Sequence, residues 1–293
     1  MKHLLATACV LASLVGGARA GWEYTAVTKA EGGGGSEAMN QTLKGQVDGE
    51  KARFEFISSG NPILGAGTYM LTRDAGAKVY LVNPQEKSYA LWDMQALMGM
   101  AGAMMKPMVT NPKTETLAEE AGGKILGYKT TRYKIRNAYT MSMNIMGFST
   151  SSDVVSEQEV WAASDLKDAA FGFRGMQQGF KTGDANFDKV LGAEMSKIKG
   201  FPLKMVSTQT TKDNRGQTQI TKTTMDVTAL KETKIADSQF QLPAGYTEKP
   251  FLPMGGGAAA GKPGQSAPGG QDMGALMKLM QEKLKNAGGQ PTR

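Results

Sequence analysis

The clearest strand signal in the chain is residues 203–230, LKMVSTQTTKDNRGQTQITKTTMDVTAL. Threonine is dense on both sides of Asp213-Asn214-Arg215-Gly216, and threonine is a strand-forming residue that tolerates water. The four intervening residues have the Asp, Asn and Gly that favour a turn. The stretch therefore predicts a long antiparallel hairpin, with strands at 203–212 and 217–230.

Strand patterns also dominate the chain upstream of this hairpin. Residues 21–93 alternate apolar and polar positions, interrupted by Asp48-Gly49, Asp74-Ala75-Gly76 and Asn83-Pro84-Gln85, which favour hairpin turns. Further strands are expected at 124–135, 140–148 and 157–161. Together these segments predict a mainly β (α+β) fold built around an antiparallel meander.

One methionine-rich segment has the period of a helix instead. Residues 91–106 are expected to form a nearly apolar helix that ends at Pro107. Its apolar stripe is continued by the methionine after the proline and comprises Leu91, Met94, Leu97, Met98, Ala101, Met104, Met105 and Met108. Such a helix must either be covered or cover something apolar.

Two more helical segments are expected further along the chain. Residues 168–199 have apolar positions at helical spacing. Residues 250–272 are rich in Gly, Ala, Pro and Ser and predict a flexible linker. Residues 273–287 follow as an amphipathic helix, which is marginal alone and implies a partner surface: the protein's own sheet, another protein or a membrane.

The first twenty residues have the pattern of a signal peptide. A basic start at Lys2 precedes an apolar run, and Ala18-Arg19-Ala20 supplies small residues for cleavage after Ala20. The sequence therefore predicts a signal peptide at 1–20, a half-barrel domain at 21–249, the linker and the last helix. It also predicts export to the bacterial periplasm, with secretion as the second choice.

The composition excludes several function classes. The only histidine, His3, and the only cysteine, Cys9, both lie in the predicted leader. A mature chain without them cannot form a Ser-His-Asp triad, an ordinary zinc site or a disulfide. We therefore expect no enzyme activity and no cofactor. The formal net charge of +7 comes from scattered lysines and arginines, so no nucleic-acid partner is expected.

Carboxylate pairs are the remaining candidates for catalysis. Glu157 and Glu159 share one face of an expected strand, and Glu119-Glu120 are expected in a loop. Neither pair lies in a recognisable acid–base motif. We interpret both as solvated surface charges.

Four short signatures carry a resemblance: GYKTTRY at 127–133, EVW at 159–161, GFPL at 200–203 and FQLPAGY at 240–246. In their order along the chain they resemble an exported bacterial family, with a domain of unknown function, in the superfamily of outer-membrane lipoprotein carriers (LolA/LolB-like). The resemblance implies a curved antiparallel half-barrel with helices across its concave face. It also implies a hydrophobic cargo, because the carriers take up lipoprotein acyl chains.

The candidate ligand-binding residues follow from the methionine-rich segment. Methionine is unbranched and polarizable, and suits a surface that accepts varied acyl chains. The expected cavity lining is Trp92, Met94, Leu97, Met98, Met104, Met105 and Met108. Two other interpretations stay open: these methionines fill the protein's own core, or methionines bind Cu(I), with Met141 and Met143 as ligands.

These observations favour a non-enzymatic periplasmic protein that binds a lipid or other hydrophobic ligand. Displacement of the helix at 91–106 would admit the ligand. Two alternatives belong to other classes. One is an exported interaction or stress-response protein that docks through its C-terminal helix, and the other is a methionine-based Cu(I)-binding protein.

Overall fold

The structure is a computed structural model that describes residues 20–33, 35–61, 64–73, 78–92, 105–145, 148–170 and 185–250. The chain divides into two units, Met1–Lys249 and Pro250–Arg293, and the described residues lie in the first except for Pro250. The predicted leader at 1–20 (except Ala20), most of the linker and the helix at 273–287 lie outside the described residues.

The described residues are mainly strands. In chain order the elements are β1 (Gly21–Gly32), η1 (Ser36–Met39), β2 (Gln41–Asp48), β3 (Lys51–Ser59), β4 (Tyr69–Arg73), β5 (Lys78–Asn83), β6 (Ser88–Leu91), β7 (Met105–Ile125), β8 (Tyr128–Ile145), β9 (Phe148–Ala163), η3 (Ser164–Leu166), α3 (Ala185–Lys197), β10 (Phe201–Asp213), β11 (Thr218–Thr233), η4 (Asp237–Phe240) and β12 (Thr247–Glu248). The prediction of a mainly β fold is confirmed.

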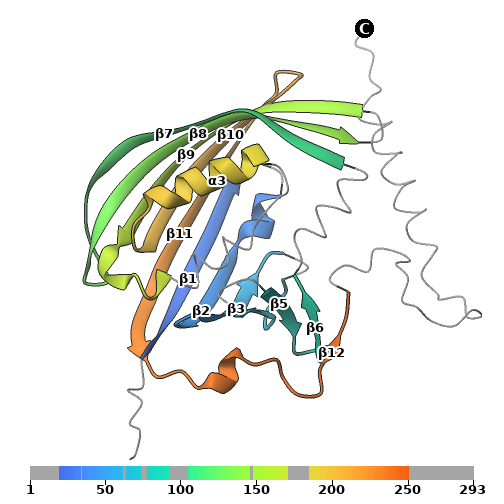
Figure 1. Cartoon of the computed structure of the whole chain (residues 1–293). Coiled ribbons are helices and arrows are strands. Elements are labelled where there is room, and N and C mark those ends of the chain that lie inside the picture. Colours follow the sequence, from blue (N-terminus) through green and yellow to red (C-terminus); the bar gives the residue numbers. More distant parts are fainter. Residues whose placement is uncertain are drawn as a thin grey trace, which may run out of the picture. The chain divides into compact units, whose positions relative to one another are not determined.

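All the described strands join one sheet. Its twelve strands follow the order β12-β6-β5-β4-β3-β2-β1-β11-β10-β9-β8-β7. Neighbours are antiparallel except β12, which runs parallel to β6. The sheet is open and strongly curved, and α3 lies across its concave side (Figure 1).

The hairpin predicted from the threonine-rich stretch is confirmed as β10 and β11. Lys212 pairs with Thr218 beside the turn, and Met205 pairs with Met225 further along. The carboxylate of Asp213 accepts hydrogen bonds from the backbone N–H groups of Arg215 and Gln217, at 3.0 and 2.7 Å. An Asp that bonds its own backbone two residues on is the mechanism expected of such a turn.

A second hairpin corrects the sequence analysis. Residues 124–135 were expected to form one strand, but the chain reverses at Leu126-Gly127, between β7 and β8. Both turn residues have positive φ, 49° and 85°, as a type I′ turn requires. Leucine is unfavourable in this conformation. Because Leu126-Gly127 lacks the Asn-Gly or Asp-Gly pattern that marks such turns, the sequence does not predict a hairpin here.

The methionine-rich helix at 91–106 is also corrected at both ends. Leu91 ends β6, and Met105 begins β7, which continues through Pro107 to Ile125. β7 is the last strand in the sheet order, so a proline without an N–H is tolerated at its outer edge. Glu119-Glu120, expected in a loop, lie within this strand. Residues 93–104 lie outside the described residues.

The second predicted helix is confirmed only in part. Of residues 168–199, Ala185–Lys197 form α3, and residues 171–184 lie outside the described residues. In the parts of the chain that the structure describes, no helix combines the length and the apolar character of a membrane span.

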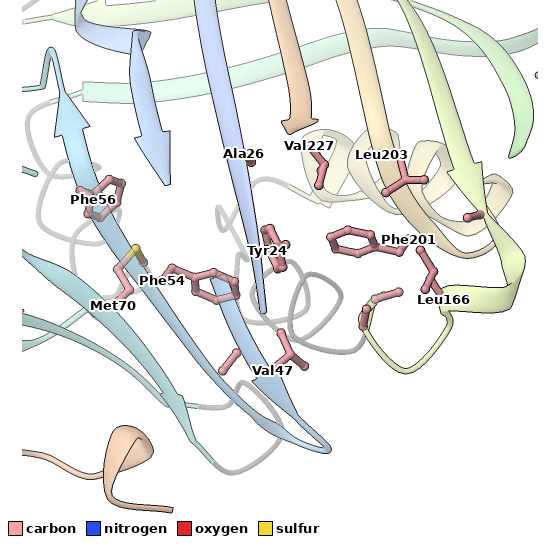
Figure 2. Close-up of a cluster of buried hydrophobic side chains, with 14 of the residues drawn as sticks. Tyr24, Ala26, Val47, Phe54, Phe56, Met70, Leu166, Phe201, Leu203 and Val227 are labelled. Carbon is pink, nitrogen blue, oxygen red and sulfur yellow. The ribbon is translucent and has the colours of Figure 1, made fainter. Parts of the chain in front are cut away.

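The main hydrophobic core, cluster 1, lies on the concave side of the sheet. Tyr24, Phe54 and Leu203 project from different strands toward one another, together with Leu166 from the connection that leads to α3 (Figure 2). The rings of Tyr24 and Phe201 meet edge-on, with centroids 5.0 Å apart. A smaller core, cluster 2, contains Tyr133, Ile135, Val160, Ala162 and Ile198, with Met205 packed against it.

The opposite face of β4 to β6 is covered by the segment that follows η4. Tyr69, Leu71 and Val82 form a third cluster, and Leu242 and Tyr246 pack against it. These last two residues belong to the FQLPAGY signature. The signature therefore marks a segment that covers the outer face of the sheet.

Candidate functional site

The structure describes three of the seven residues predicted to line a cavity. Trp92 is half-buried, packs against cluster 1 and donates its backbone N–H to the carbonyl of Val79 at 2.7 Å. Met105 and Met108 lie on β7, where they pair with Ile145 and Ser142. The other four, Met94, Leu97, Met98 and Met104, lie outside the described residues.

The expectation that Met105 and Met108 share a helical stripe with Leu91 is wrong. Both methionines are on a strand, and the side chain of Met108 is 54% exposed at the edge of the sheet. The strand forms because Val109, Thr110 and further threonines follow, and branched residues favour a pleated sheet.

The alternative Cu(I) ligands are neighbours on one strand. Met141 and Met143 are two positions apart on β8, paired with Val109 and Pro107 of β7. Among the described residues, no group of three or more His, Cys, Asp or Glu side chains could hold a metal ion. Copper binding by these methionines stays a prediction.

The structure brings together a methionine pair that the sequence analysis did not select. Met205 and Met225 face each other across β10 and β11. Met205 packs against cluster 2, and Met225 packs against cluster 1, so the pair joins the two cores on the concave face. A register count from the predicted turn at 213–216 would pair Lys212 with Gln217 and Met205 with Thr224. In the structure Lys212 pairs with Thr218, and this shift of one residue brings Met225 opposite Met205.

Three polar side chains form a cluster beneath α3, which we call the α3 polar cluster: Asn137 of β8, Gln158 of β9 and Glu194 of α3. Asn137 is only 3% exposed, and its Nδ2 donates to Oε2 of Glu194 at 2.5 Å. Gln158 also lies within hydrogen-bonding reach of this carboxyl group. Gln158 pairs with Ile135 of cluster 2, which places it on the concave face.

The α3 polar cluster is rich in hydrogen-bond acceptors. Within the described residues, Asn137 Oδ1 and Gln158 Oε1 are both buried and accept no hydrogen bond. Leaving a buried acceptor unsatisfied costs about 1–3 kcal/mol, so native proteins contain few of them. Two such atoms lie beside one carboxyl group, and neither has a donor among the described residues.

Burial controls the electrostatics of this cluster. Desolvation raises the pKa of Glu194 above its ordinary value, against the hydrogen bonds from Asn137 and Gln158 that lower it. Desolvation, assisted by the charge of Glu194, also raises the pKa of Tyr139 on β8. Buried carboxyls with perturbed pKa values are enriched at functional sites. Neither the buried carboxyl nor its amide partners were singled out from the sequence, where they carry no motif.

The carboxylates on the other face of the sheet belong to a surface network, as expected. Arg132 donates from Nε and Nη2 to Oε2 of Glu159 at 3.0 and 2.7 Å, and it also pairs with Glu120. The hydrogen bonds from Arg132 lower the pKa of Glu159 despite partial desolvation. A neighbouring ion pair joins Lys134 to Glu157 at 3.7 Å.

A hollow of about 480 Å³ lies at the ends of β1, β2 and β3. Its wall includes Thr28, Lys29, Gln41, Thr42 and Ser58. The volume is within the range of small-molecule sites. None of the methionines predicted to line a cavity is among its described wall residues, most of which have polar side chains.

Comparison with known proteins identifies the family but no activity. No curated protein matches the chain. A solved structure described as "Structure of PNGF-II in P21 space group" matches 79% of this chain and 31% of its own, with 15% identity and a TM-score of 0.33. The chain thus spans less than a third of that protein, and the TM-score is too low to indicate a shared fold. A family model matches residues 33–246, and the chain belongs to the family described as "Domain of unknown function (DUF4412)".

Proposed function

We propose that this protein is a non-enzymatic binding protein for a hydrophobic, lipid-like ligand, held on the concave face of its curved sheet. The observation that carries the proposal is the amphipathic character of that face. The half-buried pair Met205 and Met225 lies on the same face as the α3 polar cluster, beside it on the neighbouring strands. An apolar surface beside buried polar groups suits a molecule with a chain and a polar end.

The methionine pair supplies an adaptable apolar surface. Thioether side chains adjust to chains of different shape, and this property suits a site that accepts more than one lipid. Burial of an acyl chain contributes about 0.8 kcal/mol per methylene, so apolar contact alone gives useful affinity.

The helix α3 is the element that would move to admit a ligand. Its described contacts with the sheet include the hydrogen bond from Asn137 to Glu194 and one from Asn186 Nδ2 to the carbonyl of Val109 at 2.9 Å. Val190 of the helix is buried, and Ile198, just after the helix, is buried in cluster 2. A helix that packs on one face of a sheet opens at lower cost than the sheet, whose strands are joined by backbone hydrogen bonds.

The proposal includes export and a distant relationship to the lipoprotein carriers. The leader at 1–20 supports export to the periplasm, and the four sequence signatures support the relationship. Within this proposal Met94, Leu97, Met98 and Met104, which lie outside the described residues, stay candidate contacts to the ligand.

Native mass spectrometry tests the proposal directly. The protein is purified from a bacterial extract without detergent, and its bound molecules are extracted into organic solvent and identified. The same measurement follows incubation with phosphatidylethanolamine vesicles. We expect a co-purifying lipid or an added mass of one lipid per chain. An unchanged apo mass in both experiments would show that the proposal is wrong.

A matched pair of variants locates the site. Met205→Gln keeps the side-chain length but places an amide on the concave face. Val206→Gln makes the same polar change at the next residue of β10, which faces the other side. We expect Met205→Gln to reduce lipid uptake about tenfold and Val206→Gln to leave it unchanged. Equal effects of the two variants would place the ligand elsewhere.

A further inference from the structure

The α3 polar cluster contains two buried acceptors that have no partner among the residues that the structure describes. Nδ2 of Asn137 is used by Glu194, and Gln158 reaches the same carboxyl group. The oxygens that are left, Asn137 Oδ1 and Gln158 Oε1, are buried without a hydrogen bond in the described part of the chain. A ligand group that satisfies these two oxygens must bring N–H or O–H donors.

The only ionisable side chain of the α3 polar cluster is the carboxyl group of Glu194. Glu194 takes part in no ion pair among the described residues. Tyr139, the titratable group that senses its charge, is itself a weak acid. A second negative charge beside a buried carboxylate would be strongly unfavourable, since the interaction is poorly screened there. A cation or a neutral group is not penalised in this way.

The α3 polar cluster and the apolar surface of Met205 and Met225 are close enough for one amphiphilic molecule to contact both. Gln158 pairs with Ser207 of β10, and Ser207 is two residues from Met205 on the same face. Residues i and i+2 of a strand are about 6.6 Å apart. A molecule whose polar end reaches Gln158 therefore places its first few methylenes over Met205 and Met225.

We propose that the α3 polar cluster binds the polar end of the ligand and selects an amphiphile whose headgroup donates hydrogen bonds and carries no net negative charge. The ligand class comprises amphiphiles with a primary ammonium or hydroxyl group at the polar end, whereas fatty acids and headgroups of net negative charge are rejected. This inference rests on the proposed function, because it assigns the polar end of the same ligand.

Three probes with one chain length test the inference: dodecylamine, dodecanol and dodecanoate, titrated into the full protein below their micellar concentrations by calorimetry. We expect the amine and the alcohol to bind at least about tenfold more tightly than the carboxylate, which corresponds to about 1.4 kcal/mol. Dodecanoate binding as tightly as dodecylamine would overturn the headgroup assignment while leaving the proposed function intact. If none of the three binds, the proposed function fails as well.

A variant separates the charge of Glu194 from the structure of the site. Glu194→Gln keeps an acceptor for Asn137 and removes the charge. We expect it to weaken dodecylamine about tenfold and to leave dodecanol unchanged, which also shows that the site is still folded. Glu157→Gln, the same change on the opposite face, serves as the control and should alter neither ligand. A uniform loss for all three probes in Glu194→Gln would contradict the inference.

Discussion

Nδ2 of Asn137 lies 2.5 Å from Oε2 of Glu194, and this hydrogen bond joins β8, the strand next to the edge strand β7, to α3 across 57 residues of sequence. Asn137 is almost fully buried, and Glu194 is largely withdrawn from water. The bond therefore connects the element proposed to move with a strand that contributes to the proposed headgroup site. Its strength depends on the protonation of Glu194.

The stability of the protein should depend on pH through Glu194. Burial raises its pKa, so the folded state holds the proton more tightly than the unfolded state. The free energy of unfolding therefore falls as pH rises from the ordinary value of 4.5 through the raised folded value. Glu194→Gln should remove this loss. The melting temperature of the variant, relative to the wild type, should be higher at pH 8 than at pH 4; a difference independent of pH would contradict the assignment.

Glu23 should show the opposite dependence. Hydrogen bonds from Lys231 first, and then from Lys44 and Gln46, outweigh desolvation and lower its pKa from 4.5 to about 2. The stabilisation is complete above pH 4.5 and is lost as pH falls toward 2. Glu23→Gln should melt below the wild type at pH 6, and the two should converge near pH 2. Glu232→Gln, an exposed acid on β11, is the control and should show no such convergence.

Phe201 should be the most sensitive position of cluster 1. Its side chain is 2% exposed and meets Tyr24 at a ring-centroid distance of 5.0 Å. Truncation removes this contact and leaves a cavity, so Phe201→Ala should lower the free energy of unfolding by about 3–5 kcal/mol. Urea denaturation followed by circular dichroism measures the change. Ile220→Ala, at a site that is 55% exposed, should change it by less than about 0.5 kcal/mol.

One substitution in the turn between β7 and β8 should raise the stability of the protein. Leu126 has a φ of 49°, a conformation that costs a non-glycine residue about 1–2 kcal/mol and that asparagine tolerates better. Leu126→Asn should therefore raise the free energy of unfolding by roughly 1 kcal/mol, measured in urea.

Leu117→Asn is the matched control for the turn substitution. Leu117 is 45% exposed, close to the 43% of Leu126, and it lies within β7 without a positive φ. Its replacement should bring no stabilisation. An equal gain at both sites would show that removal of an exposed leucine, and not relief of the turn, is responsible.

The outcome of the sequence analysis differed between two hairpins for a local reason. Asp213 bonds to its own backbone, so the turn between β10 and β11 is encoded in the residues that form it. Leu126-Gly127 form an equally tight turn without such chemistry, and the strand pairing on either side holds the leucine in a strained conformation. A pattern that depends on turn residues finds the first hairpin and misses the second.

Met105 and Met108 show a second limit of prediction from sequence periodicity. Met105 and Met108 fit a helical spacing, but the same residues also fit an edge strand, and the pairing of β7 with β8 decides between them. A short apolar segment does not distinguish the two periods by itself. The candidate site was predicted within one continuous methionine-rich segment. The methionine pair of the concave face, Met205 and Met225, comes instead from two neighbouring strands.

The sequence by itself determined the mainly β class, the β10–β11 hairpin and the absence of His and Cys after residue 9, since these depend on local periodicity and composition. Only the tertiary structure decided which side chains meet. Strand order places Met205 and Met225 between two cores, and α3 places Glu194 beside Asn137. No local pattern specifies such contacts, because they depend on how segments distant in the chain pack, and the burial that follows changes the chemistry of the residues involved.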